Sequence, residues 1–434
     1  MKNHHCRRVA LVLALCLLLG GCQASRQAAS YDAYALGQAD VPNLPNAEKN
    51  ATAYLKALDR LRGNGVEAGF VPALDAFTGR TAQTFAAQEG GDNLIYSPAN
   101  LYLALCMLSE ITAGDSRAQV LDLLGLQTIE EARQAANQLW RNLYRDGETD
   151  KTLLANSLWL NRQATPKQAA VKTLSEDYYA SVFQVPMGDP ATDQAISDWI
   201  SANTGGLVSG NLQTTQETLL TLISTLYFKG RWTHPFPVSR TAQGVFACKD
   251  GSEQTVDFMH STKDGYYYQG EGYSAAALSF GGGQTMWFLL PDEEEAADAL
   301  LDRAVLDGGF SAEALEFDTI RWTVPKLDLN ASLDLLQTLP DLGVPDLLDQ
   351  ARADFSSLTD TTPAWLTDAR HSVRVKLDEE GCEAAAVTEV AAAAEAPMTQ
   401  RTVEMTLDRP FVFLITGTEG LPLFLGVVNT LQAS

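Results

Sequence analysis

The chain has 434 residues, of which 46% are hydrophobic and 20% charged, and this balance excludes a disordered, collagen-like or coiled-coil protein. Its 54 acidic and 31 basic residues give a formal charge of −23, which argues against nucleic acid as a partner because few cations are available to neutralise phosphates. Six cysteines are too few and too irregularly spaced for a disulfide scaffold, and no CxxC pair indicates a zinc site. Neither a metal nor a cofactor is expected.

The N-terminus has the pattern of a secretory leader. A few basic residues precede an apolar run over 9–19, which is too short to span a bilayer. The following Leu19-Gly20-Gly21-Cys22 resembles the lipobox of bacterial lipoproteins. This resemblance implies removal of residues 1–21, a lipid on Cys22 and a place at the bacterial cell surface. The alternative is a plain secretory leader in which Cys22 is an incidental thiol.

The next predicted elements are helical. From Gln23 to about Asn50 the chain is rich in Ala, Ser, Gln, Asn and Pro, and Leu55, Leu58 and Leu61 follow at helical spacing. This predicts a flexible tether over 22–70 that contains one short helix over 51–62. A firmer helix begins at Pro72, a residue favoured in a first helical turn, and we expect one domain over 71–434.

Strands dominate the rest of the chain. Apolar, β-rich segments predict strands over 153–160, 219–228, 275–290, 373–377, 403–407 and 411–416. Because helices cluster in the first third and strands follow, the predicted fold class is α+β rather than alternating βαβ.

The chain carries no recognisable catalytic motif, since HExxH, GxSxG, P-loop and EF-hand patterns are absent from the sequence. Gly281-Gly282-Gly283 lies between two strand-like runs, which favours a hairpin turn over a phosphate-binding loop. The acidic run over 292–295 is typical of a solvated loop, because consecutive carboxylates do not converge on a cation. We therefore do not expect an enzyme.

The most informative stretch runs from Glu379 to residue 394 and is rich in alanine. By propensity alone it is an exposed helix or a low-complexity loop. At a period of two, however, one face carries only small or medium residues, as a segment must if it slides between two existing strands of a packed core. The residues of this face are Cys382, Ala384, Ala386, Thr388, Val390 and Ala392, whereas Glu383 and Glu389 fall on the outward face.

Over about residues 74–432 the chain resembles the serpin superfamily of serine and cysteine protease inhibitors. The motifs that carry the resemblance, in order, are Asn93-Leu94-Ile95-Tyr96-Ser97-Pro98, Leu154-Ala155-Asn156-Ser157-Leu158-Trp159, Tyr227-Phe228-Lys229-Gly230, Val324-Pro325-Lys326, Arg409-Pro410-Phe411 and Leu423-Phe424-Leu425-Gly426. The resemblance implies a monomer with the serpin fold, in which helices pack on a large central, mostly antiparallel sheet and a reactive-centre loop is exposed.

The resemblance also implies roles for individual residues. It places a polar cluster beneath the sheet, the shutter, at Ser97, Asn100, Ser224 and His371, with Asn100 and Ser224 exchanged relative to many members. It places the breach, where the loop enters the sheet, at Trp232, Lys326 and Glu379. The hinge of the loop comprises Glu379, Gly381, Cys382, Glu383, Ala384, Ala385, Ala386, Val387 and Thr388. No residue is assigned a catalytic role.

The implied function is that of a suicide-substrate inhibitor of serine, or alternatively cysteine, proteases. The target attacks the loop and forms a covalent acyl-enzyme, and the freed segment inserts into the sheet. Family spacing from Glu379 puts the scissile bond at Glu395-Ala396, but the loop is longer than in a typical member, so Met398 and Arg401 are alternatives. Two other hypotheses stay open. One is a non-inhibitory serpin acting as a carrier or chaperone, and the other is a solute-binding lipoprotein.

Overall fold

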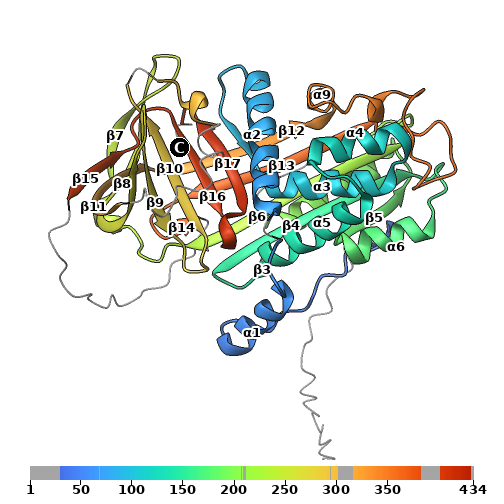
Figure 1. Cartoon of the computed structure of the whole chain (residues 1–434), viewed down its shortest axis with the longest axis horizontal. Coiled ribbons are helices and arrows are strands. Elements are labelled where there is room, and N and C mark those ends of the chain that lie inside the picture. The colour runs from blue at the N-terminus through green and yellow to red at the C-terminus, as the bar shows by residue number, and fades with distance from the viewer. Residues whose placement is uncertain are drawn as a thin grey trace, which may run out of the picture.

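The computed structural model describes residues 30–67, 69–206, 208, 212–293, 295–301, 316–382 and 401–431. Two large sheets make up most of the described chain (Figure 1). Figure 1 shows one sheet at one end of the molecule and helices α3, α4 and α5 lying over the other sheet.

The helices fall mainly in the first half of the chain. They are α1 (Ala51–Arg62), α2 (Phe70–Glu89), α3 (Pro98–Ile111), α4 (Gly114–Leu124), α5 (Ile129–Leu143), α6 (Gln168–Asp177), α7 (Pro190–Asn203) and the short α9 (Leu335–Thr338). Polar side chains cap several of them, as when Asn50 Oδ1 accepts a hydrogen bond from Ala53 N at the start of α1. Nearly every residue of α3 is buried, which explains its almost wholly apolar sequence.

The first sheet has eight strands in the order β1-β5-β4-β6-β14-β13-β12, with β3 paired to β4. These strands are β1 (Ala35–Gly37), β3 (Arg145–Asp146), β4 (Asp150–Asn161), β5 (Ala180–Val185), β6 (Leu220–Arg231), β12 (Leu327–Asp334), β13 (Asp368–Leu377) and β14 (Gly381–Cys382). Both faces of β6 are covered. Ile223 packs with residues of α7 on one face, while Leu222 and Leu226 belong to the main core on the other.

The second sheet has nine strands in the order β15-β11-β8-β9-β10-β16-β17-β2, with β7 paired to β8. These strands are β2 (Leu94–Tyr96), β7 (Ala242–Ala247), β8 (Glu253–Gln269), β9 (Tyr273–Ser279), β10 (Thr285–Pro291), β11 (Glu316–Pro325), β15 (Thr402–Thr406), β16 (Phe411–Thr416) and β17 (Pro422–Val428). The glycines 281–283 form the predicted hairpin between β9 and β10, closed by Phe280 N donating to Gln284 O at 2.9 Å.

The predicted α+β class is confirmed, and each predicted strand segment overlaps observed strands. The helix over 51–62 has the predicted bounds, and α2 begins at Phe70 rather than Pro72. The sheets are more mixed than expected, because β4 and β5, β6 and β13, and β11 and β15 each pair in parallel.

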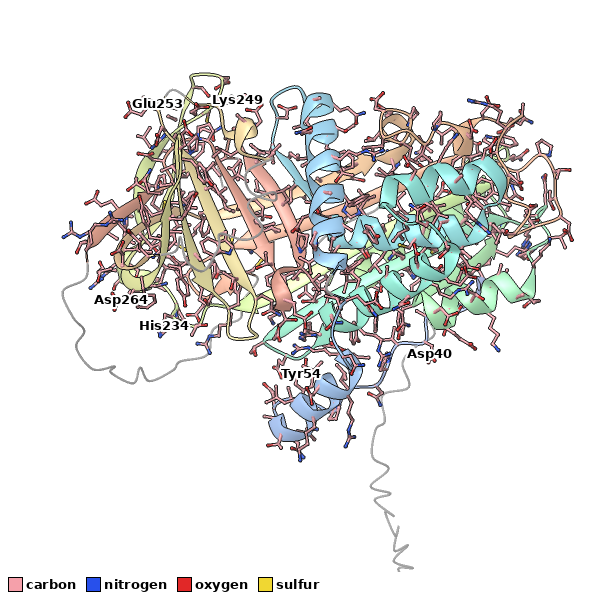
Figure 2. The ribbon with its side chains drawn as sticks, viewed as in Figure 1. Asp40, Tyr54, His234, Lys249, Glu253 and Asp264 are labelled. Carbon is pink, nitrogen blue, oxygen red and sulfur yellow. The ribbon has the colours of Figure 1, made fainter. Side chains whose placement is uncertain are left out.

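The segment before α2 differs from the flexible tether predicted over 22–70. From Ser30 onward it packs on the domain, and β1 extends the edge of the first sheet with Ala35 opposite Phe183. The ring of Tyr31 lies 6.0 Å from that of Phe183, and α1 buries Tyr54 (Figure 2). The prediction failed because composition was its only basis, whereas a strand added to a sheet edge is held by backbone hydrogen bonds that need few large side chains.

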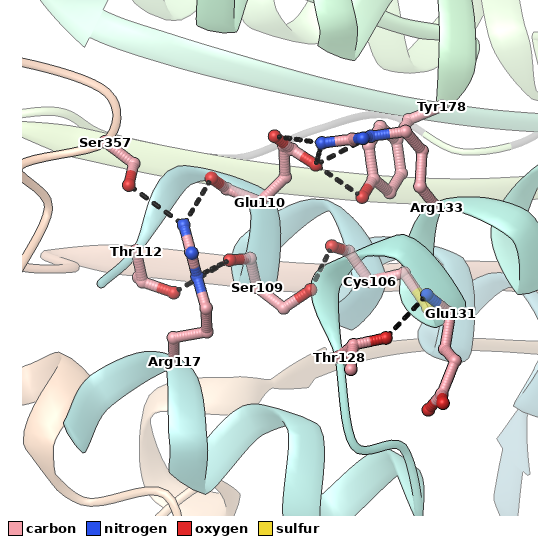
Figure 3. Close-up of polar contacts among 10 residues, drawn as sticks. All are labelled: Cys106, Ser109, Glu110, Thr112, Arg117, Thr128, Glu131, Arg133, Tyr178 and Ser357. Atoms are coloured by element: carbon pink, nitrogen blue, oxygen red, sulfur yellow. Dashed lines mark hydrogen bonds and ion pairs between the residues drawn. The ribbon is translucent and has the colours of Figure 1, made fainter. Parts of the chain in front are cut away.

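Polar contacts join the helices that cover the first sheet (Figure 3). Glu110 of α3 accepts hydrogen bonds from the Arg133 guanidinium of α5 at 2.9–3.2 Å and from the Tyr178 hydroxyl at 2.9 Å. Arg117 of α4 donates to Ser357 Oγ at 2.9 Å. Arg117 Nε also donates to the carbonyl of Ser109 in α3 at 2.9 Å, so polar bonds join α3 to both α4 and α5.

Candidate functional site

The first sheet is only partly paired at its centre. β6 and β13 are parallel neighbours over 221–226 and 368–373. Beyond these residues the two strands are bridged by β14, in which Gly381 and Cys382 pair with β6 and Cys382 also pairs with Leu377 of β13. β14 is antiparallel to both neighbours. A two-residue strand therefore stands at one end of a position where a full central strand could lie.

Gly381 stands at the start of this short strand. Its φ is +150°, and a Cβ at this position would lie 2.1 Å from the carbonyl oxygen of Gly230. Only glycine fits such a conformation so close to a neighbouring backbone. Cys382, the next residue, is 1% exposed. The close packing explains why the two hinge residues that pair within the sheet, Gly381 and Cys382, are small.

Glu379, Lys326 and Trp232 come together where β14 meets the sheet. Lys326 Nζ lies 2.9 Å from Glu379 Oε1, and Thr241 Oγ1 donates to the same oxygen at 2.6 Å. Burial acts to raise the pKa of Glu379, but the hydrogen bonds from Thr241 and Lys326 outweigh it and hold that pKa below its ordinary value. Trp232 Nε1 donates to the carbonyl of Asp378 at 3.1 Å, which anchors the chain just before the short strand.

The four predicted shutter residues meet beneath the point where β6 and β13 pair. His371 Nε2 accepts a hydrogen bond from Ser97 N at 2.9 Å, and His371 Nδ1 lies 3.1 Å from Ser224 Oγ. Asn100 Nδ2 donates to Ser224 Oγ at 2.8 Å and to Thr225 O at 2.7 Å. Asn100 and Ser224 thus bond directly to each other.

His371 is neutral in this cluster. Because Nε2 accepts an N–H, the ring proton is assigned to Nδ1, from which it is donated to Ser224. The ring is fully buried, and burial lowers the pKa of His371 to about 3. In the described geometry His371 holds β13 to Ser97 at the start of α3 and to Ser224 of β6.

Two members of these clusters escaped sequence reasoning. Asn156 of β4 donates from Nδ2 to Asn100 Oδ1 at 3.1 Å and lies opposite Ser224 in the sheet. A polar residue within the apolar run over 153–160 in β4 was the signal that could have marked it. Thr241, which bonds Glu379, lies in a connection before β7 and gave no such signal.

Arg401, an alternative reactive-bond residue, lies where the chain rejoins the second sheet. Its carbonyl accepts a hydrogen bond from Thr319 N at 3.1 Å. Its Nη2 lies 2.7 Å and 3.1 Å from the carboxylates of Glu316 and Asp318. The remaining predicted residues of the loop and leader lie outside the described residues, namely Cys22, Glu383, Ala384, Ala385, Ala386, Val387, Thr388, Glu395, Ala396 and Met398.

A hollow of about 610 Å³ opens beside the parallel part of the β6 and β13 pair. It lies between β13 and the segment after α7, and its lining includes Leu212, Thr218, Arg370 and Ser372. Across the described ranges, no cluster of three or more His, Cys, Asp or Glu side chains is placed to hold a metal ion. No helix in those ranges is long and apolar enough to cross a membrane.

These features define an α+β protein of two sheets. In the first sheet the short strand β14 lies between β6 and β13 and is antiparallel to both. A family model described as Serpin (serine protease inhibitor) matches residues 72–431, so the chain belongs to the serpin family. Members of this family are protease inhibitors and not enzymes.

Two curated relatives illustrate the similarity. Plasminogen activator inhibitor 1 of Sus scrofa is 28% identical over 359 residues, covering 77% of this chain and 86% of the relative. Serpin-ZX of Arabidopsis thaliana is 26% identical over 361 residues, covering 77% and 91%.

Solved structures agree with the fold. The thermophilic serpin tengpin in its native state superposes with a TM-score of 0.77 at 24% identity, covering 86% of this chain and 98% of tengpin. Thyroxine-binding globulin in complex with thyroxine gives a TM-score of 0.75 at 23% identity, covering 84% and 99%. At these identities the likeness establishes the serpin fold alone.

Proposed function

We propose that this protein is a suicide-substrate inhibitor of serine proteases that traps its target by inserting the cleaved loop between β6 and β13. The observation that carries the proposal is the register of β14. Cys382 lies opposite Gly230 of β6 and Leu377 of β13, and the pairing is antiparallel on both sides. Each further loop residue would therefore pair with the residue of β6 and the residue of β13 whose numbers are one smaller.

Two independent pairings support this register. Counting from Cys382, Ala386 would fall opposite Leu226 on β6 and opposite Val373 on β13. Leu226 and Val373 are already opposite each other in the parallel part of the sheet. One strand can therefore enter between them and stay in register with both, without either neighbour sliding along its axis.

The same count assigns the side chains to faces. Ala384, Ala386 and Val390 would join the buried face of Leu226 and Val373, where small residues fit a packed core. Thr388 would arrive between Ser224 and His371, so a polar side chain would meet the polar cluster. The loop sequence thus alternates in step with the surface that would receive it.

The outward face shows matching charge. Glu383 would lie between Lys229 and Lys376, and Glu389 would lie beside Arg370, which lines the 610 Å³ hollow. Opposite charges on neighbouring strands contribute roughly 0.2–1 kcal/mol each. We infer that these pairs help to select the inserted register over one shifted by a residue.

Insertion would release substantial free energy. A strand from Gly381 to residue 392 would match the 12 residues of β6 and replace the six existing β6 and β13 pairs by pairing on both sides. At roughly 0.5–1.5 kcal/mol of net hydrogen bonding per residue, the total is on the order of 10 kcal/mol. Such a gain requires a native state that is held by a kinetic barrier.

We infer that the reactive bond precedes Arg401. A protease must place the scissile carbonyl in its oxyanion hole, whereas the Arg401 carbonyl is bonded to Thr319 N within the sheet. These contacts favour Glu395-Ala396 or Met398 over Arg401-Thr402.

A non-inhibitory serpin is the second candidate. Its support is that the fold is shared with thyroxine-binding globulin, whose structure contains thyroxine. The small residues at every inward position of the hinge count against it, because non-inhibitory serpins often carry bulky or charged residues there. Membership of the serpin family removes the support for a solute-binding lipoprotein.

We also propose that the protein is a monomer carried on the bacterial cell surface by a lipid on Cys22. The motif Leu19-Gly20-Gly21-Cys22 supports this anchor. Growth with a labelled fatty acid should label the wild-type chain and leave Cys22→Ala unlabelled. Equal labelling of the two chains would contradict the anchor.

The test of inhibition is incubation of the leader-free protein with elastase-, chymotrypsin-, trypsin- and glutamyl-type proteases. We expect a protease complex that survives SDS with at least one of them, and mass spectrometry of the released fragment would locate the reactive bond. Clean cleavage by every protease without a stable complex would overturn the inhibitory function and favour the carrier.

A further inference from the structure

Two aromatic rings lie exposed together on the outer face of the second sheet. Tyr266 of β8 and Phe317 of β11 are directly opposite, with ring centroids 5.5 Å apart at 75°. Each is 52% exposed, and they are the only exposed aromatic side chains in the part of the chain that the structure describes. An aromatic pair left on an open sheet face is a common sign of a contact surface.

The rim of this aromatic pair is polar and carries both signs of charge. Thr319 Oγ1 donates to Asp264 at 2.7 Å, and Figure 2 labels Asp264 at this end of β8. Arg321 lies 3.3 Å from Glu404 of β15, with both side chains more than 60% exposed. An apolar centre within a polar rim is the arrangement of a binding hot spot. Because the rim charges pair with one another, recognition would depend on the rings.

The aromatic pair lies close to the end of the reactive loop. Thr319, two residues along β11 from Phe317, donates its N–H to the carbonyl of Arg401. With a rise of about 3.4 Å per residue and about 4.8 Å between strands, Phe317 is roughly 10 Å from the point where the chain rejoins the sheet. The surface is therefore continuous with the base of the loop.

The reach of the loop decides what would cover this surface. The favoured bonds at Glu395-Ala396 and Met398 lie a few residues before Arg401, which limits them to at most about 20 Å from it. A trypsin-sized protease is roughly 40 Å across. A stable interface also buries about 800 Å² on each partner, contributed by about 20–30 residues, more than a short loop offers.

We propose that Tyr266 and Phe317 form a second docking surface for the target protease, which contacts its body while the loop occupies its cleft. This inference rests on the proposed inhibitory function. Contact with this surface speeds the first binding of the protease and leaves the later insertion of the loop unchanged. It therefore sets how fast a protease is captured and which protease is preferred, without changing how many inhibitor molecules each capture consumes.

The test is the double variant Tyr266→Ser/Phe317→Ser, with the protease that gives an SDS-stable complex with the wild type. We expect the second-order rate constant of complex formation to fall about tenfold, with unchanged inhibitor consumed per protease and an unchanged thermal midpoint. The fall should be the same at low and high salt, because the contact is apolar. Val245→Ser is the matched control, since Val245 is 51% exposed on β7 far along the same sheet.

Several outcomes would overturn the docking surface while leaving inhibition intact. One is an undiminished rate for the double variant, and another is an equal loss for Val245→Ser. A rise in inhibitor consumed per protease would show that the substitutions act on the loop instead. If the double variant proves less stable, Tyr266→Phe and Tyr266→Ser form a second test, in which only the serine variant should be slower. Failure of the wild type to form any complex would overturn the proposed function, and the docking surface with it.

Discussion

Loop insertion in the register of β14 predicts opposite outcomes for two neighbouring alanines. Ala386→Glu would place a carboxylate between Leu226 and Val373, which are 1% and 0% exposed. Ala385→Glu would place the same carboxylate on the other face, beside the partly exposed Arg374. Neither substitution changes a residue of β14, which ends at Cys382, so the pairing of β14 with β6 and β13 is kept in both variants.

The expected magnitude follows from burial. An unpaired carboxylate forced into a core costs several kcal/mol even after relaxation. If about 3 kcal/mol of that cost is felt at the barrier to insertion, insertion slows roughly 150-fold. Hydrolysis of the acyl-enzyme would then win the competition, and Ala386→Glu would behave as a substrate. Ala385→Glu should trap the protease as the wild type does.

The assay mixes each variant with the protease at several ratios and separates complex from cleaved inhibitor on an SDS gel. For Ala386→Glu we expect cleavage at an undiminished rate, with the inhibitor consumed per protease raised more than tenfold. Equal trapping by the two variants would refute the inserted register. Equal failure of both would show that any charge in the hinge is disruptive, which would refute the assignment of faces.

Three further outcomes concern the native state. Glu379→Gln should lower the thermal midpoint near pH 7. Because the folded pKa of Glu379 is lowered, the difference from wild type should be full above the ordinary pKa of 4.5, shrink as the pH falls below 4.5, and vanish only below the lowered folded value. A difference that does not shrink as the pH falls below 4.5 would contradict the pairing with Lys326. Asn100→Ala should lower the free energy of unfolding, measured with denaturant, by about 2–4 kcal/mol, since it leaves Ser224 and Asn156 with fewer buried hydrogen-bond partners. A smaller loss would show that the cluster is dispensable. Deleting residues 30–40 should lower the thermal midpoint and speed amide exchange in β5, which loses its β1 neighbour; unchanged exchange would mean that β1 contributes nothing to the sheet edge.

The order of elements in the domain was accessible from the sequence because each has a local signal. Pro72 marked the first turn of α2, and the glycines 281–283 marked a hairpin between two apolar runs. The packed segment from Ser30 to α1 gave no comparable signal. Its strand is three residues long and takes its stability from pairing with β5, so nothing in its own side chains distinguishes it from a tether.

The candidate site likewise contains residues that the sequence predicted and residues that it could not predict. Ser97, Asn100, Ser224 and His371 were assembled from far-apart motifs only because those motifs resemble a known family. Thr241 could not be found, since its hydrogen bond to Glu379 depends on the path of an irregular connection. The pKa of His371 is likewise a property of the folded cluster, because burial alone lowers it to about 3.

In the hinge, the helix preference of the residues conflicts with the strand conformation that the proposed insertion requires. Alanine is the best helix former, and on propensity the run after Gly381 would be a helix. The described structure gives a packing reason for the first two residues of this segment, because Gly381 has no room for a Cβ and Cys382 is packed between two strands. Under the proposed insertion, the inward positions of the loop need small side chains, and alanine meets this need with only a weak strand preference. Weak strand preference would then help to keep the inserted state kinetically distant until cleavage frees one end.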